Sequence, residues 1–268
     1  MADTQLFRIL NRLETCRIFE AKVDQKTVGS IYAMKYMYGC GWIGGLLVHK
    51  EFRRKGVSRK LLEKAVGWLD TSYTYASVET ENTVAQKLFK GMDFNTVYRR
   101  LNHKVQNPYG RRNVGEVISL DVQWGELVRA MGFKERGGIV NLGYYPIKLT
   151  EHVFDHLKSR KRVLKLGSVI AVVENSHIVD FNGYAFIFND HILNKVPLPT
   201  GREIVEVNPF YIEQNVSDLI RLLNNLASGE VMVWTHQGDL LASKLTVEGT
   251  LGALVLELYG KIKTQSRD

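Results

Sequence analysis

The chain has 268 residues, of which 45% are hydrophobic and 24% charged, a composition typical of a globular protein and not of a disordered or fibrous one. Its longest apolar stretches, such as LGSVIAVV from Leu166 and LGALVLEL from Leu251, fall far below the roughly 18 residues of a membrane span, and its two cysteines exclude a disulfide scaffold. The net charge of +8 comes from residues 1–105, which carry 18 basic and 10 acidic side chains, so we expect an anionic partner for this part of the chain.

The N-terminus shows no signal-peptide pattern, and Cys16 and Cys40 suit a reducing compartment. We therefore expect a cytoplasmic protein that does not bind a membrane. The seven histidines and the cysteines lack metal-ligand spacing, so no metal is expected. The oligomeric state cannot be inferred from these residues.

The first 105 residues predict an alternation of strands and helices. In chain order we expect a short helix near 6–13, strands at 17–24 and 27–37 joined by a polar turn, a strand at 42–48, a helix at 56–70, a strand at 73–79, a helix at 83–92 and a strand at 94–105. The strand at 42–48 is apolar without alternation, as expected of a strand buried on both faces. In the helix at 83–92, Val84, Leu88 and Met92 form one apolar stripe.

The second half repeats this order after a stretch with the composition of a linker, QNPYGRRN at 106–113. We expect a helix at 151–165, a hairpin of 168–174 with 177–188, a strand at 203–207, a helix at 217–226 and strands at 230–234 and 252–258. The chain is thus predicted to hold two α/β domains, 1–105 and 114–268, of which the second is a diverged copy of the first.

A basic turn stands between the apolar strand and the helix at 56–70. Five Lys or Arg residues lie between Arg53 and Lys60, around Gly56. A helix start can bind an anion because its first N–H groups lack partners and carry the positive end of the helix dipole. A solvated basic loop is the alternative for any charge run. A nucleic-acid helix is less favoured, because the apolar residues form a core stripe and no base-reading groups lie among the charges.

Two motifs resemble those of the GNAT superfamily of acyl-CoA-dependent N-acyltransferases. Arg53-Arg54-Lys55-Gly56-Val57-Ser58 is similar to the family's pyrophosphate loop, with Ser58 where Gly or Ala is usual. Asn82-x-x-Ala85-x-x-Leu88-Phe89-x-x-Met92-Asp93-Phe94 is similar to its second signature. Asp93 replaces the usual Gly, a tolerable change because Asp accepts left-handed backbone angles. The resemblance covers about residues 17–105, and the strand and two helices that precede the first hairpin in the family are largely missing.

The resemblance implies a mixed, mostly antiparallel sheet flanked by helices, in tandem with a degenerate second GNAT-like domain. It implies that Arg53, Arg54, Lys55, Gly56, Val57 and Ser58 bind the pyrophosphate of acetyl-CoA. Pantetheine would pair with the strand edge that ends at Leu47 and Val48, and an N–H near Leu47 would stabilise the oxyanion. Asn82 would bind the pantetheine arm, although it could equally be a helix N-cap, and Phe89 would pack beside this arm.

Proton transfer is where the sequence departs most from the family. Phe89 stands where many members have a Tyr that protonates the leaving thiolate, so Tyr98 or water would act instead, or the thiolate would leave unprotonated. Glu79, at the end of the strand at 73–79, is the best-placed general base, acting through a water. A solvated Glu paired with a nearby Lys is the alternative for Glu79.

The expected function is acetyl transfer from acetyl-CoA, the co-substrate, to a primary amine on a small molecule or a protein. The alternative is a non-catalytic module that binds CoA, another anion or nucleic acid through the same turn. The second half is expected not to hold CoA, because the segment before its helix, NPFYIEQNV from Asn208, has no glycine and only acidic charge.

Overall fold

The computed structural model describes residues 10–106, 118–181, 184–189, 201–213, 215–226, 230–239 and 249–259. The chain forms two compact units. The first comprises residues 1–96, 181–183 and 255–268, and the second comprises residues 97–180 and 184–254. These units differ from the expected division into 1–105 and 114–268, and that division stays a prediction. Most of the expected linker and the first half of the helix near 6–13 lie outside the described residues.

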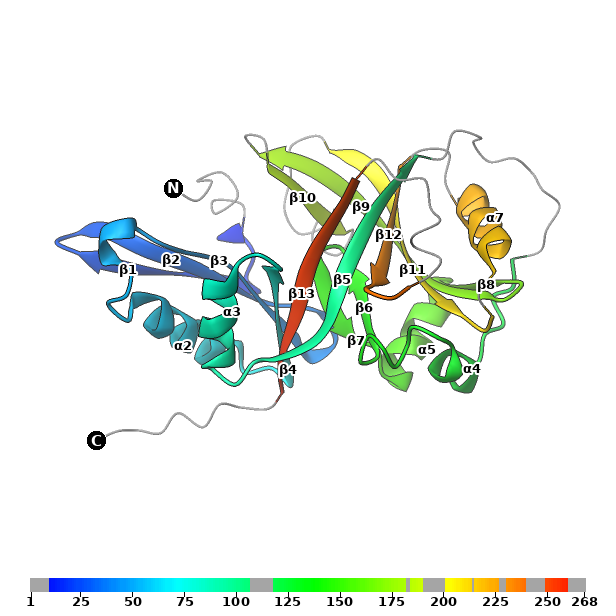
Figure 1. The fold of residues 1–268 in the computed structure, drawn as a ribbon, viewed down its shortest axis with the longest axis horizontal. Coiled ribbons are helices and arrows are strands. Elements are labelled where there is room, and N and C mark those ends of the chain that lie inside the picture. The colour runs from blue at the N-terminus through cyan, green and yellow to red at the C-terminus, as the bar shows by residue number, and fades with distance from the viewer. Residues whose placement is uncertain are drawn as a thin grey trace. The chain divides into compact units, whose positions relative to one another are not determined.

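The first unit is built around a sheet with the strand order β1-β2-β3-β4-β13 (Figure 1). Its elements are β1 (Cys16–Val23), β2 (Lys26–Lys35), β3 (Cys40–Val48), α2 (Val57–Leu69), β4 (Tyr73–Glu79), α3 (Thr83–Lys90) and the end of β13 (Gly249–Tyr259) from Val255 onward. Most of these elements match the expected ranges. The polar turn between β1 and β2 has positive φ at Asp24 and Gln25, the geometry that joins two antiparallel strands most tightly.

Helix α2 packs on one face of this sheet, against β1, β2 and β3 (Figure 1). Glycines on the strands let it approach closely, since a Cβ on Gly41 would lie 3.1 Å from the Leu69 side chain. Leu61, Leu62, Ala65 and Leu69 are buried at this contact. Trp42, the next residue along β3, points to the opposite face, where its Nε1 donates to Tyr32 Oη at 3.2 Å.

The second unit holds a sheet with the strand order β5-β12-β11-β9-β10, with β8 paired to β9, and a separate β6-β7 pair. Its elements are β5 (Asn95–Gln106) from Val97 onward, α4 (Trp124–Arg129), β6 (Ile139–Leu142), β7 (Tyr145–Lys148), α5 (Glu151–Ser159), β8 (Val163–Leu166), β9 (Val169–Phe181), β10 (Tyr184–Asn189), β11 (Arg202–Tyr211), α7 (Val216–Leu226) and β12 (Glu230–His236). The residues of β13 before Val255 also belong to this unit.

The predicted fold class, a mixed and mostly antiparallel sheet flanked by helices, is confirmed. The pairs β1-β2, β2-β3, β5-β12, β9-β11, β8-β9 and β6-β7 are antiparallel. Two crossovers, β3-α2-β4 in the first unit and β11-α7-β12 in the second, join parallel pairs. In each crossover the first strand also pairs antiparallel with a strand that comes earlier in the chain. Strand β3 pairs with β2, and β11 pairs with β9. This shared local topology is compatible with a diverged second GNAT-like domain, which stays a prediction.

Two expectations for the second unit are wrong. The helix expected to reach residue 165 ends at Ser159, because Lys161 has a φ of 57° and the following β8 pairs with β9. The hairpin expected between 174 and 177 is one continuous strand, β9. Ser176 is polar because its hydroxyl donates to the buried carboxylate of Glu206, not because the chain turns there.

Two expectations for the first unit are also wrong. Val84 on α3 is 79% exposed, so the apolar stripe of that helix does not begin there. Strand β3 is buried only from Cys40 to Ile43 and is alternately half-buried and exposed to Val48. Within the described part of the chain, no helix is long and apolar enough to cross a membrane.

Candidate active site

The basic turn leads from β3 into α2 through two residues in the left-handed region, Arg54 with a φ of 61° and Gly56 with a φ of 78°. Gly56 is the N-cap of α2, and it offers no side chain to the first N–H groups of the helix. The first turn of α2 contains no acidic residue. These N–H groups therefore suit an external anion, as the sequence predicted for a helix start.

Basic side chains surround this helix start. Arg53, Arg54, Lys55 and Lys60 are all exposed. Arg53 Nε donates to Val48 O at 3.0 Å, and Lys55 Nζ lies 5.2 Å from the centre of the Phe52 ring. A Cβ added to Gly56 would meet no atom within 4 Å, so the space beside its backbone is open. Val57 and Ser58, the first residues of α2, are half-buried.

Strands β3 and β4 separate beside this turn. They pair in parallel only where Cys40–Trp42 lies against Tyr73–Tyr75, and no further pair between them is present in the described residues. Farther along β3, Gly45 and Leu46 lie opposite the single residue Ile31, a bulge in which Gly45 has a φ of 61°. Bulges of this kind bend a strand and end its pairing. Among the described residues, the edge of β3 that faces β4 thus has no strand partner from Ile43 to Val48.

Leu47 lies on this unpaired part of β3, and its side chain is 46% exposed. Its partner across the other edge of β3 is Ser30. The structure thus brings Leu47 and Val48 together with the basic turn at one end of the sheet. The contacts of Leu47 and Val48 with pantetheine and the oxyanion stay predictions.

Asn82 is the N-cap of α3, because its Oδ1 accepts a hydrogen bond from Ala85 N at 3.1 Å. A helix cap was one of the two roles expected for this residue. Its Nδ2 has no partner among the described residues and is available to a ligand. Phe89, near the end of the same helix, is 5% exposed and packs edge to face on Phe94 with ring centres 5.0 Å apart. The ring of Phe89 is therefore mainly a core group, and its contact with pantetheine stays a prediction.

Glu79 ends β4 with an exposed side chain. Its backbone oxygen accepts from Asn82 N at 3.0 Å and from Gln86 Nε2 at 3.2 Å, which fixes the turn into α3. Its carboxylate forms no ion pair with any residue that the structure describes, so the expected alternative of a Lys partner is not seen. The role of Glu79 as a general base stays a prediction.

Tyr98 belongs to the second unit, where it is buried and its hydroxyl accepts from Asn141 Nδ2 at 3.0 Å. Burial raises the pKa of Tyr98, an effect that Arg100 and Arg136 partly offset. Tyr98 also lines a cavity of about 580 Å³ within that unit, together with Arg99, Glu135, Tyr211, His236 and Asp239. Its role as a proton donor stays a prediction.

One residue near the separated strands was missed by the sequence analysis. Glu257 on β13 accepts a hydrogen bond of 2.6 Å from the hydroxyl of Tyr75, the last residue of β4 that pairs with β3. Both residues belong to the first unit. Its signal in the sequence is a single carboxylate within the apolar stretch LGALVLEL, in the strand expected at 252–258.

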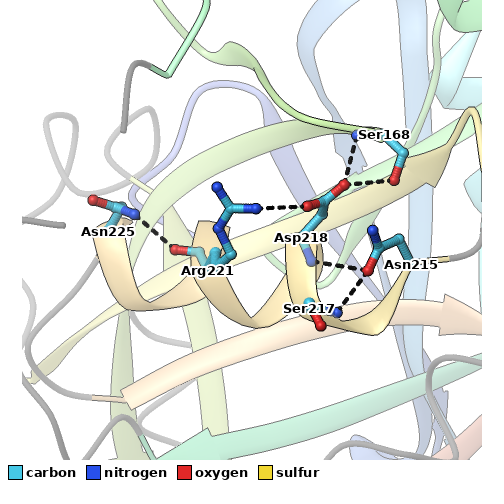
Figure 2. Close-up of polar contacts among 6 residues, drawn as sticks. All are labelled: Ser168, Asn215, Ser217, Asp218, Arg221 and Asn225. Carbon is cyan, nitrogen blue, oxygen red and sulfur yellow. Dashed lines mark hydrogen bonds and ion pairs between the residues drawn. The ribbon is translucent and has the colours of Figure 1, made fainter. Parts of the chain in front are cut away.

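The corresponding helix start in the second unit is occupied by the chain itself (Figure 2). Asn215 Oδ1 accepts from Ser217 N at 3.0 Å and from Asp218 N at 3.4 Å. The carboxylate of Asp218 accepts from Ser168 N and Oγ, both at 2.8 Å, and from Arg221 Nη1 at 3.0 Å. A phosphate at the start of α7 would therefore meet capped N–H groups and a negative charge.

The strand edge of the second unit is occupied as well. Strands β11 and β12 pair in parallel only over Val205–Val207 and Val231–Val233. Beyond Val207, Asn208 Oδ1 accepts from Asn141 N at 2.8 Å, Pro209 O accepts from Arg136 Nη2 at 2.7 Å, and Met131 pairs with Tyr211. This edge is thus covered by the segment 131–141 of the same unit.

Comparison with known proteins supports the motif assignment. Residues 2–94 match the model of the acetyltransferase (GNAT) family. No curated protein sequence matches the chain. Among solved structures, the chain is similar to a proposed acetyltransferase from Thermoplasma acidophilum, with 13% identity, a TM-score of 0.49 and coverage of 91% of this chain and 78% of that one.

Two further structures are similar to the chain. One is a proposed acetyltransferase from Pyrococcus horikoshii, with 15% identity, a TM-score of 0.43 and coverage of 96% of this chain and 78% of that one. The other is the ribosomal-protein-S18-alanine N-acetyltransferase from Escherichia coli, with 19% identity and a TM-score of 0.32. The match with the Escherichia coli enzyme covers 36% of this chain and 63% of that one, less than two thirds of its length. The family model and the two motifs thus agree: residues 2–94 are similar to the acetyltransferase (GNAT) family.

Proposed function

We propose that the chain transfers an acetyl group from acetyl-CoA to a primary amine, using a site in its first unit. The observation that carries the proposal is the helix start at Gly56. It is uncapped, surrounded by basic side chains and continuous with the unpaired edge of β3. A polyanionic cofactor with an extended, amide-containing arm fits both the helix start and the strand edge. Its phosphates can accept hydrogen bonds from the helix N–H groups, and the amides of its arm can pair with the edge of β3.

In this proposal, the pyrophosphate of acetyl-CoA binds the N–H groups of Val57 and Ser58, and Arg53, Arg54, Lys55 and Lys60 supply charge-assisted hydrogen bonds. Pantetheine lies along β3 and receives a hydrogen bond from Asn82 Nδ2. The N–H near Leu47 stabilises the oxyanion when the amine attacks the carbonyl. Glu79, through a water, removes a proton from the attacking amine.

A thermal-shift titration of the Gly56→Glu variant tests cofactor binding. A ligand at a hundred times its dissociation constant adds about 2.7 kcal/mol to stability, so acetyl-CoA should raise the Tm of the parent clearly. Glu at position 56 fits sterically because the space is open, but it places a negative charge beside the pyrophosphate. The variant should therefore lose the shift.

The matched control is Gly67→Glu, which adds the same charge to an open position at the far end of α2. Each shift is measured against the same variant without ligand, because a side chain at the positive φ of Gly56 itself costs about 1–2 kcal/mol. The control should keep the parental shift. A folded Gly56→Glu protein with the parental shift contradicts the proposed cofactor site.

Catalysis is tested by an acceptor screen that detects the free thiol of CoA. Its panel holds spermidine, L-lysine, kanamycin and a peptide with an N-terminal alanine. We expect thiol release above the rate without acceptor for at least one of these amines. A parent protein that binds acetyl-CoA but acetylates none of them would favour the non-catalytic alternative.

A further inference from the structure

The second unit contains a cavity that lies outside the proposed active site. Its volume is about 580 Å³, within the range of roughly 300–1,000 Å³ that is typical of small-molecule sites. The parallel strands β11 and β12 end at Tyr211 and His236, and both of these residues line the cavity. All of its lining residues belong to the second unit. The carboxyl ends of neighbouring parallel strands are a common place for ligand sites in α/β folds, so the cavity is a candidate ligand site.

The walls of this cavity combine apolar and polar groups. Tyr98 and Tyr211 are buried aromatic residues, and Met131 is an exposed apolar one. The ionisable residues of the lining are Arg99, Glu135, His236 and Asp239. Sites for organic ligands have this mixture, because apolar walls hold the body of the ligand and a few polar groups fix its orientation.

A buried guanidinium lies behind one wall. Arg136 is 0% exposed, and its Nη2 donates to Pro209 O at 2.7 Å. The same nitrogen is 4.0 Å from Asp239 Oδ2, beyond hydrogen-bond distance. Gly132 lines the cavity, and a Cβ on Gly132 would lie 3.6 Å from Arg136 Nη2. Because Gly132 has no side chain, the charge of Arg136 lies close beneath the cavity wall.

Several nitrogens around this cavity lack a hydrogen-bond partner. Within the part of the chain that the structure describes, Arg136 Nε and Nη1, Arg99 Nε and His236 Nδ1 are buried without one. Arg99 Nη1 makes one long hydrogen bond, of 3.5 Å to Gln237 Oε1. Unsatisfied buried polar groups are rare in native proteins, and a missing ligand is one explanation for such a group.

The acidic groups of the lining, by contrast, accept hydrogen bonds. Glu135 Oε2 accepts from Gly132 N at 2.9 Å, and Asp239 Oδ2 accepts from Tyr211 Oη at 3.3 Å. Burial, followed by the nearby Arg136, lowers the pKa of His236, so its imidazole is neutral at pH 7. The positive charge around the cavity therefore comes from arginine, and the group that would complete the site is an acceptor with a negative charge.

We propose that this cavity binds a small organic carboxylate with an apolar body. The carboxylate accepts hydrogen bonds from the half-buried guanidinium of Arg99, whose planar shape matches the two oxygens, and its charge compensates that of Arg136. The apolar body packs against Tyr98, Tyr211 and Met131. The site uses the second unit alone, so the proposal does not rest on the proposed function.

A titration of the full chain followed by fluorine NMR tests this site. The probes are para-fluorobenzoate, para-fluorophenylacetate and para-fluorocinnamate, which carry a carboxylate on aromatic bodies of different length. The primary amide of each acid is its matched neutral probe. We expect saturable binding of at least one acid. Its amide should bind at least about tenfold more weakly, because hydrogen bonds to a charged group are stronger than neutral ones.

Substitutions at Arg99 locate the bound acid. Gln at this position keeps a polar side chain but loses the charge, so Arg99→Gln should raise the Kd of the tightest acid at least about tenfold. Arg129→Gln is the matched control, because it removes the same charge from an exposed position of the same unit outside the cavity, and it should keep the parental Kd. Gly56→Glu should also keep the parental Kd, because the basic turn of the first unit is not the proposed site.

Arg99→Lys is the second variant. Lys keeps the charge and loses the planar pair of donors, so this variant should bind the acid more tightly than Arg99→Gln and less tightly than the parent. Equal Kd values for the Lys and Gln variants overturn the proposed role of the charge. A parental Kd for Arg99→Gln, or a loss of binding in Gly56→Glu, shows that the acid binds elsewhere and overturns the proposal. Equal binding of acid and amide, or no binding of any of the three acids, overturns it as well.

Discussion

The closed helix start of the second unit makes a quantitative prediction for Asp218→Asn. Asp218 is 6% exposed and accepts two hydrogen bonds from Ser168 and one from Arg221 (Figure 2). Hydrogen bonds to a charged group contribute about 1.5–3 kcal/mol each, against about 0.5–1.5 kcal/mol for neutral ones. Arg221 is 43% exposed, so its ion pair adds at most about 1 kcal/mol. The two bonds from Ser168 therefore decide the effect.

Asn keeps an oxygen for Ser168 but loses the charge, so the variant should lose about 2 kcal/mol of unfolding free energy at pH 7. This corresponds to a decrease in Tm of roughly 4–8 °C for a protein of this size class. The measurement is thermal unfolding of the parent and of the variant. Asp155→Asn, at an exposed position on α5, is the control and should stay within about 0.5 kcal/mol of the parent.

The effect should depend on pH in one direction. The hydrogen bond from Ser168 N, followed by weaker contributions from Ser168 Oγ and Arg221, lowers the pKa of Asp218, although burial opposes them. A lowered pKa stabilises the fold above the unfolded-state value, near 3.9 for Asp, and this stabilisation is lost as the pH falls through the folded-state value. The difference between parent and Asp218→Asn should thus be full at pH 7 and shrink in acid. A difference that is absent at pH 7, or unchanged at acid pH, refutes the reasoning.

Two further predictions concern the proposed active site and the number of cofactors. Glu79→Gln should lower turnover about a hundredfold without changing the thermal shift with acetyl-CoA, and parental turnover at every pH tested would remove Glu79 from the mechanism. Titration calorimetry should give one CoA per chain, because both the helix start and the strand edge of the second unit bind the unit's own groups. A stoichiometry of two would show that these groups give way to a ligand.

Local backbone chemistry could be predicted well from the sequence. Asp93, which stands where the family has a glycine, was expected to accept a left-handed angle and has a φ of 61°. Gly56 was expected to open a helix at a turn, and α2 begins directly after it. A helix cap was the alternative to pantetheine binding for Asn82, and Asn82 is a helix cap. In each case the deciding interaction lies within a few residues of the chain, so a single sequence contains it.

The failures share a different origin. The hairpin expected between residues 174 and 177 lies where Ser176 and its neighbours interrupt the apolar run, yet the partner of Ser176 is Glu206, 30 residues away. Glu257 was passed over because its partner, Tyr75, is 182 residues away. A polar residue within an apolar stretch shows that a compensating group exists, but the sequence does not show where.

The two crossovers show how one topology leaves a helix start without a side-chain cap in one unit and with such a cap in the other. Helix α2 begins at Gly56, which has no side chain to offer, and helix α7 begins after Asn215, whose Oδ1 accepts from two N–H groups. Since helix N–H groups take whichever acceptor is nearest, an anion at α2 meets no side-chain cap from Gly56, whereas at α7 it must displace Asn215. The carboxylate of Asp218 adds repulsion to that competition. Opening the second helix start to a phosphate would therefore require the loss of both groups together, and neither single substitution should create a second CoA site.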